Sequence, residues 1–223
     1  MLSAQTPVSQ IVLDHSECAT ILVRHRIDYC CNGGLPLAEA CKKRGVDPQE
    51  LLGELEEAIT QRSEPRGADP RTLKTDELVA HIVRRHHRYL RGALPFLVPL
   101  ATKVARVHGA HNANLLDVRD LVEELADTLE PHLDHEEQVL FPVLVGENPE
   151  ENLAATLAAN HGDHLEVADL LEELRNASHN YHLPGTACSS FTTLYRELQA
   201  LEADLFEHVH LENHVLLPRF ARS

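Results

Sequence analysis

Aromatic residues are scarce in this chain of 223 residues: Phe, Tyr and Trp together make up 4% of it, and Trp is absent. An aromatic core is therefore not expected. Cysteine is also sparse, and its five positions follow no regular spacing: Cys18, Cys30, Cys31, Cys41 and Cys188. An odd, irregular set of cysteines does not form a disulfide framework and is typical of a reducing compartment. The sequence therefore predicts a cytoplasmic protein.

Long apolar runs and an excess of basic charge are both missing. No stretch approaches the roughly 20 apolar residues that a membrane-spanning helix needs. The N-terminus has no basic region followed by an apolar run, so no secretory signal is expected. With a formal net charge of −15, the chain has little to neutralise a phosphate backbone or to attract anionic lipids. We therefore expect a soluble protein that binds neither nucleic acid nor membranes.

The hydrophobic content of 43% is sufficient for a buried core. Residues 1–60 have the pattern of a small helical domain, which begins with an amphipathic run at residues 8–25. A later helix in this domain should begin where Asp47 can act as its cap and Pro48 can occupy its first position. Residues 61–75 are polar and contain two prolines and one glycine, which is typical of a linker.

Residues 76–223 have the apolar periodicity of long helices. Four helices are expected, at residues 76–108, 115–144, 149–177 and 189–220. Pro95 and Pro99 should kink the first helix, and Asn148 should cap the third helix near Pro149. Alternating β-branched runs are absent, so no sheet is expected. The predicted fold class is all-α: a small N-terminal helical domain and an up-down four-helix bundle.

Histidine is unusually abundant, with 16 residues, of which 14 follow residue 75. Two of the expected helices share the motif H-x-x-x-E-x-x-V-L-[FL]-P, which runs from His132 to Pro142 and again from His208 to Pro218. The shared proline argues against a chance resemblance between amphipathic helices. Because histidine is the commonest metal ligand, the duplicated motif indicates a metal site.

The spacing of the motif places its His and Glu on one helix face, with Cβ atoms about 5–6 Å apart. The apolar Val-Leu pair that follows indicates that this face points into the bundle, where an unpaired carboxylate is costly. Metal coordination removes that cost. A single His-x-x-x-Glu pair is usually a solvated polar face, but two copies in matched context favour two metals, typically about 3.5–4 Å apart.

The other two helices offer partner histidines. His87 precedes His132 by 45 positions and His164 precedes His208 by 44, and apolar residues follow both partners at +3, +7 and +10. The rival partners, His86 and His161, fit this pattern less well. The predicted ligands are His87, His132, Glu136, His164, His208 and Glu212. Eight further histidines are expected at the surface or behind the ligands: His81, His86, His108, His111, His135, His161, His210 and His214.

Four imidazoles and two carboxylates suit iron or manganese better than copper(I), and zinc would be redox-silent. If both carboxylates bridge, each metal has four protein ligands. Open positions then remain for oxygen species, water or nitric oxide. From the residues alone we therefore expect two ions of iron or manganese.

Four segments carry a further resemblance. Two lie outside the ligand motifs, Asp28-Tyr-Cys30-Cys31-Asn-Gly-Gly34 and Ala101-Thr-Lys-Val-Ala-Arg-Val-His108, and two lie within them, Glu136–Pro142 and Leu211–Pro218. With these segments, essentially the whole chain resembles the repair of iron centres family, whose C-terminal domain is hemerythrin-like. The six predicted ligands fall on the family's ligand positions. The resemblance implies a carboxylate-bridged centre of two non-haem iron ions with an oxo or hydroxo bridge. It also implies a protein that restores iron-sulfur clusters damaged by nitrosative or oxidative stress, by donating iron to damaged or apo iron-sulfur proteins.

The vicinal thiols Cys30 and Cys31 can form an easily reduced disulfide or bind a soft metal. With the resemblance, we expect them to act as an iron or redox relay, and we expect the other three cysteines to be inert. Pro131, directly before a predicted ligand, should kink its helix.

Two other functions share this ligand set: a nitric oxide reductase, which would make the protein an enzyme, and a sensor or carrier of nitric oxide or oxygen. A carrier has no obvious need for vicinal thiols. Iron donation and nitric oxide reduction are both consistent with the sequence, as are a monomer and a homodimer.

Overall fold

The computed structural model describes residues 2–62, 69–146 and 153–220. Within these ranges the chain forms helices and loops and no strand, and its one β-type pairing is an isolated bridge between Pro7 and Pro36. The predicted all-α class is confirmed. None of the described helices is both long and apolar enough to cross a membrane.

The chain divides into two compact units, which consist of Met1–Leu73 with Phe206–Arg219 and of Lys74–Leu205 with Phe220–Ser223. Among the described residues, four α-helices lie wholly in the first unit: α1 (Val8–Asp14), α2 (Ala19–Arg24), α3 (Leu37–Arg44) and α4 (Pro48–Gln61). The amphipathic run at residues 8–25 is therefore two helices rather than one.

The first unit has its own apolar core. Its fully or nearly fully buried members include Val8, Ile11, Leu22, Leu37, Leu51, Leu55 and Val209. Burying each such side chain contributes about 1.5–3 kcal/mol. Asp47 caps α4 as expected, because its side chain accepts hydrogen bonds from the amides of Gln49 and Glu50 at 2.7 and 3.2 Å. Such a cap is worth about 1 kcal/mol.

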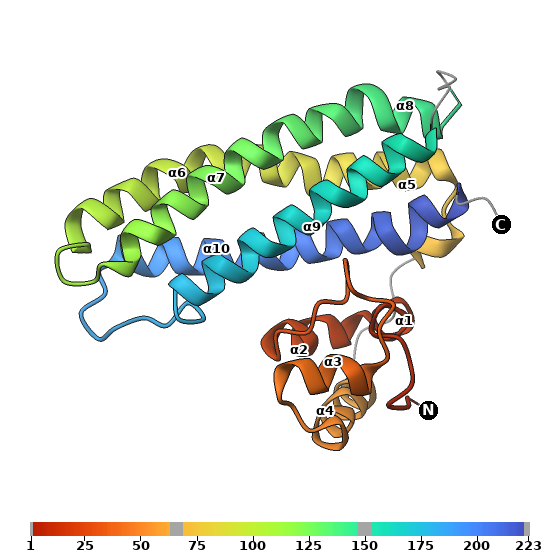
Figure 1. Ribbon diagram of the computed structural model, residues 1–223, viewed down its shortest axis with the longest axis horizontal. Coiled ribbons are helices and arrows are strands. Elements are labelled where there is room, and N and C mark those ends of the chain that lie inside the picture. Colours follow the sequence, from red (N-terminus) through yellow and green to blue (C-terminus); the bar gives the residue numbers. More distant parts are fainter. Residues whose placement is uncertain (1, 63–68, 147–152, 221–223) are drawn as a thin grey trace. The chain divides into compact units, whose positions relative to one another are not determined.

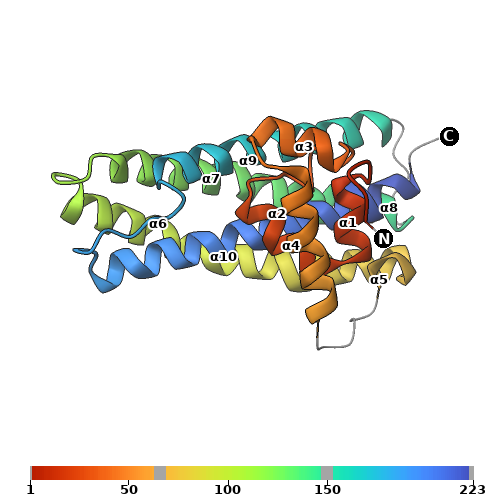
Figure 2. The ribbon, with the colours of Figure 1, turned by 90° about the horizontal axis from the view of Figure 1, so that it is seen from below.

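The second unit contains the long helices. Its elements are α5 (Thr75–Ile82), α6 (Arg88–His108), α7 (Asn114–His135), α8 (Phe141–Leu144), α9 (Leu153–Ala177) and α10 (Ser189–Leu211) as far as Leu205. Helix α6 packs on α7, and α7 packs on α9. The long helices run side by side in both Figure 1 and Figure 2. This is the expected helical bundle.

Short π-helical segments interrupt three of the four expected helices, at Val83–His87, Glu136–Leu140 and Glu212–Leu216. Helix α6 continues through Pro95 and Pro99 without ending. The expected start of the third long helix, at Asn148 and Pro149, lies outside the described residues. The apolar side chains at +3, +7 and +10 from His87 and from His164 are buried, so both histidines share a helix face with the core.

Candidate metal centre

Glu136 lies at the centre of the His/Glu cluster in the second unit. Its side chain is 0% exposed, although it begins a π segment on a helix with a polar outer face. Three imidazoles surround the carboxylate. Its Oε2 lies 3.3 Å from His87 Nε2, and its Oε1 lies 3.2 Å from His132 Nε2 and 3.7 Å from His164 Nε2. These four residues come from three different helical stretches of the bundle.

His208 and Glu212 repeat the arrangement in the C-terminal copy of the motif. His208 Nε2 lies 3.1 Å from Glu212 Oε1, and both side chains are buried. The two residues are one helical turn apart, as the spacing predicts. The buried faces of both copies hold one imidazole and one carboxylate each.

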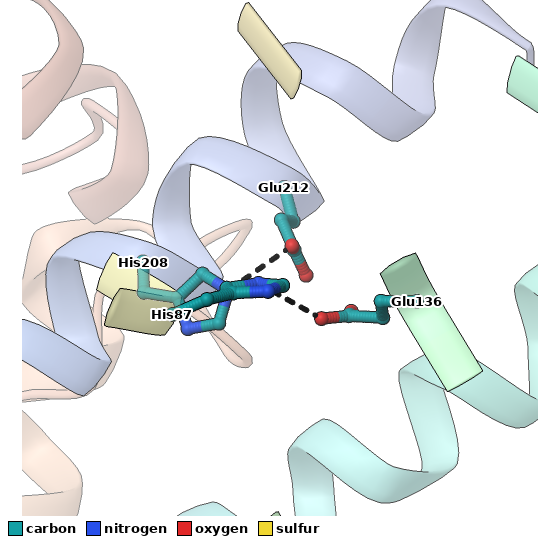
Figure 3. Close-up of side chains that lie close together, drawn as sticks. All are labelled: His87, Glu136, His208 and Glu212. Atoms are coloured by element: carbon teal, nitrogen blue, oxygen red, sulfur yellow. Dashed lines mark hydrogen bonds and ion pairs between the residues drawn. The ribbon is translucent and has the colours of Figure 1, made fainter. Parts of the chain in front are cut away.

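The ligand atoms of these residues converge into two groups of four. One group is His87, Glu136, His208 and Glu212, and Figure 3 shows these side chains directed toward one another. The other group is His132, Glu136, His164 and Glu212. Within each group the ligand atoms all lie within 4.8 Å of one another. Because Glu136 and Glu212 belong to both groups, the arrangement suits two cations that share two carboxylates.

Two further carboxylates fix the orientation of the imidazoles. Glu137 Oε1 lies 2.9 Å from His87 Nδ1, and Asp163 Oδ2 lies 3.2 Å from His132 Nδ1. Arg91 in turn bonds Glu137 at 3.1 Å. Histidine ligands of metals almost always donate their outer N–H to such a partner.

The donor set fits a metal. When Nδ1–H of His87 or His132 donates to its outer carboxylate, a neutral ring presents a bare Nε2 to the interior. The lone pair of Nε2 then faces an oxygen of Glu136 at 3.2–3.3 Å. Both atoms are hydrogen-bond acceptors, and both are buried, so they repel each other. A cation between them, or a second proton on each ring, removes the repulsion. Imidazole and carboxylate together suit iron or manganese.

The electrostatics keep Glu136 ionised. Burial alone raises the pKa of this carboxyl group. When the rings carry a proton on Nε2, hydrogen bonds from His132, His164 and His87 outweigh burial and hold the pKa well below its ordinary value. An ionised, buried carboxylate is the form that bridges metals.

The sequence did not predict the π segments, although all three contain a proposed ligand: His87 ends the first, and Glu136 and Glu212 begin the other two. Such segments occur often at functional sites, because the wider turn redirects side chains. The signal was present in the motif, whose E-x-x-V-L stretch is the π segment in both copies. A proline follows each copy and cannot donate a hydrogen bond to the preceding turn.

The vicinal cysteines lie in a loop of the first unit that Asp28 organises. The carboxylate of Asp28 accepts hydrogen bonds from the amides of Cys30 and Cys31 at 2.9 Å each and from the amide of Asn32 at 3.0 Å. The two sulfur atoms are 3.6 Å apart. Ligand atoms of Asp28, Cys30 and Cys31 also lie within 4.8 Å of one another.

The two thiols differ in exposure. Cys30 is 4% exposed, and burial, followed by its contacts with Cys31 and Asp28, raises the pKa of its thiol well above the ordinary value. Cys31 is half-buried. The loop therefore holds one neutral, buried thiol beside a more accessible one.

Histidines outside the ligand set are not all at the surface. His86 is fully buried, and its Nδ1 lies 3.1 Å from Asp204. His210 is also buried, and burial, followed by the charge of His214, lowers its pKa to about 3. His161 is exposed. Burial alone therefore does not mark a histidine of this chain as a metal ligand.

Two family matches cover most of the chain. Residues 78–220 match the hemerythrin HHE cation binding domain. Residues 4–59 match a domain of unknown function, DUF542. The helical bundle with a buried His/Glu set is therefore a hemerythrin-like cation-binding domain.

Curated relatives match nearly the full length. An iron-sulfur cluster repair protein, ScdA, of Staphylococcus haemolyticus is 32% identical over 99% of this chain and 100% of its own length. ScdA of Staphylococcus epidermidis is 30% identical over 98% and 99%. The iron-sulfur cluster repair protein YtfE of Escherichia coli is 30% identical over 96% and 95%. The chain belongs to this ScdA and YtfE family.

Replacing Glu137 with Ala should weaken iron binding about 10- to 100-fold, because His87 loses the partner that fixes its tautomer and ring orientation. Competition with a calibrated iron chelator measures the affinity. Asp134→Ala is the matched control, since Asp134 also bonds Arg91, at 2.7 Å, but Glu137 is the residue that bonds His87. Equal affinities for the two variants would contradict an orienting role for Glu137.

Proposed function

We propose that this protein repairs iron-sulfur clusters damaged by nitrosative or oxidative stress, by delivering iron from its buried site to damaged or apo iron-sulfur proteins. The observation that carries the proposal is the convergence of buried imidazoles and carboxylates into two groups that share Glu136 and Glu212. Repair is also the function named for relatives that match nearly the whole chain.

The proposed iron ligands are His87, His132, Glu136, His164, His208 and Glu212. Bound at this set, iron would supply a redox-active and exchangeable cation. The protein side chains hold and release it. Glu137 and Asp163, which orient two of the imidazoles, keep 30% and 46% of their side chains exposed. The residues that contact the ligands from behind are therefore themselves partly exposed to solvent. This short distance to the surface favours release of iron from a site that is otherwise buried.

We propose that Cys30 and Cys31 relay the iron. The support is the contact of their loop with the ligand-bearing segment. His214 Nε2 lies 2.7 Å from the carbonyl oxygen of Cys30, and Asn213 donates to the same oxygen at 3.3 Å. Both residues directly follow Glu212. A thiolate is a good ligand for iron, so a pair of thiols next to this segment is suited to accept a departing ion.

We propose the domain division that the sequence suggests: a helical domain at residues 1–60 with the vicinal cysteines, a linker at 61–75, and the metal-binding bundle at 76–223. The family matches at 4–59 and 78–220 support it. We also propose the cytoplasm as the location, because all five cysteines are free thiols.

Reactivation of a damaged enzyme tests the function. The iron-loaded protein, mixed anaerobically with an iron-sulfur enzyme that nitric oxide has inactivated, should restore that enzyme's activity. The chelator-stripped protein should not restore it. Equal recovery with stripped protein, or no recovery with loaded protein, would contradict the proposal.

A further inference from the structure

Cys188 differs from the other cysteines in being exposed to solvent. It directly precedes α10, and its carbonyl oxygen accepts the amide of Thr192 at 2.9 Å, so it occupies the capping position of this 23-residue helix. Amides at a helix start favour a negative charge.

A histidine from another helix completes the arrangement. His108, the last residue of α6, places its Nε2 3.1 Å from Cys188 Sγ. Its ring rests against that of Phe191, with centroids 5.6 Å apart, and Phe191 is 1% exposed. The Nζ atom of Lys103 donates a hydrogen bond to Ser190 Oγ at 3.1 Å, which places a positive charge at the same helix start. A nucleophile and a base within hydrogen-bond reach are the components of an activated thiol.

The pKa of the Cys188 thiol is shifted in the opposite direction to the pKa values of the buried thiols. The backbone amide of Phe191 and then His108 lower the pKa of Cys188. Burial instead raises the pKa of Cys18 to about 12, and it raises those of Cys30 and Cys41. Since the thiolate is the reactive form, Cys188 combines access with activation.

We propose that Cys188 and His108 form a thiol-exchange site, at which an anionic low-molecular-weight disulfide modifies the chain reversibly. The site lies in the second unit, 21 residues along the helical stretch from His87, which is about 30 Å at 1.5 Å per residue. It therefore acts apart from the metal ligands and is independent of the proposed repair function.

The exchange balances without any further oxidant. The proton of the Cys188 thiol moves to His108 Nε2, and the resulting thiolate attacks one sulfur of the disulfide. A new S–S bond forms as the old one breaks. The departing thiolate takes the proton from the His108 imidazolium. The sulfur of Cys188 is thus oxidised and the departing sulfur is reduced, and a free thiol reverses the reaction. Lys103 offers a charge that complements a carboxylate on the small disulfide.

The test uses the full iron-loaded chain with glutathione disulfide as the probe and mass spectrometry of peptides to locate and time the adduct. Cys188 should react first, and Cys188→Ser should remove this adduct. Preferential modification of Cys31, or a rate at Cys188 no higher than that of free glutathione at the same pH, would overturn the proposal.

A His108→Asn variant tests the pairing. We expect the pH midpoint of the Cys188 reaction to rise by about one unit and the rate at pH 7 to fall about threefold. The tenfold loss of thiolate is partly offset, because a more basic thiolate is a better nucleophile. His111→Asn, at an exposed histidine of the loop after α6, is the matched control. In urea all three chains should react alike. An unchanged pH profile in a folded His108→Asn protein would overturn the assignment.

Discussion

Replacing Glu136 or Glu212 with Ala should remove most of the iron from the protein, whereas the unaltered chain should hold about two iron ions. Each carboxylate belongs to both groups of ligand atoms, so its loss takes one ligand from each metal at once. In the Glu136 variant, the imidazoles of His87, His132 and His164 would converge on an uncharged space. Elemental analysis of protein matured with ample iron gives the stoichiometry, and the optical spectrum reports the state of the centre.

Matched controls exist on the same helices. Glu130 and Glu207 are exposed glutamates of α7 and α10, and replacing either with Ala should leave both irons in place. A Glu136→Ala or Glu212→Ala protein with full iron and an unchanged spectrum would show that this carboxylate is not a ligand. If the iron content of the unaltered chain were about one, two metals would be excluded.

Changing both Cys30 and Cys31 to Ser should slow iron transfer to an apo iron-sulfur protein by at least about tenfold, while the iron content stays nearly intact. Neither cysteine is a proposed resting ligand. The loop should survive the substitution, because His214 and Asn213 bond the backbone of Cys30 rather than its sulfur. A tenfold loss corresponds to about 1.4 kcal/mol of transition-state stabilisation. The rate of cluster formation on the acceptor measures transfer.

Cys188→Ser is the control for the loss of a thiol and should leave transfer unchanged. Production of nitrous oxide from nitric oxide, if it occurs, should change much less than transfer in the double variant. The reverse pattern, with normal transfer and lost nitrous oxide production, would replace the relay with a nitric oxide reductase.

The sequence predicted the helical bundle well, because the spacing of apolar residues within each helix determines which face is buried. Apolar residues at helical spacing predicted that His87 and His164 face the core, and burial of the following apolar positions agrees. The duplicated His-x-x-x-Glu motif predicted two imidazole–carboxylate pairs, and the distances within both pairs are 3.1–3.2 Å.

Features that depend on contacts between distant segments were not predictable in this way. The pairing of His108 with Cys188 joins residues 80 positions apart, so no spacing rule reveals it. Glu137 is an unremarkable polar residue in the sequence until its bond to His87 is known. The burial of Cys30 likewise depends on packing in the first unit, which the loop sequence alone does not reveal.

The central claim, that iron held by this protein rebuilds damaged clusters, is tested most directly by the reactivation experiment with a labelled metal. The protein is loaded with iron-57 and mixed anaerobically with an iron-sulfur enzyme that nitric oxide has inactivated. Mössbauer spectroscopy of the re-isolated enzyme should then show iron-57 in its rebuilt cluster, with recovery of activity in proportion. A rebuilt cluster without iron-57, while the label stays on this protein, would contradict iron donation.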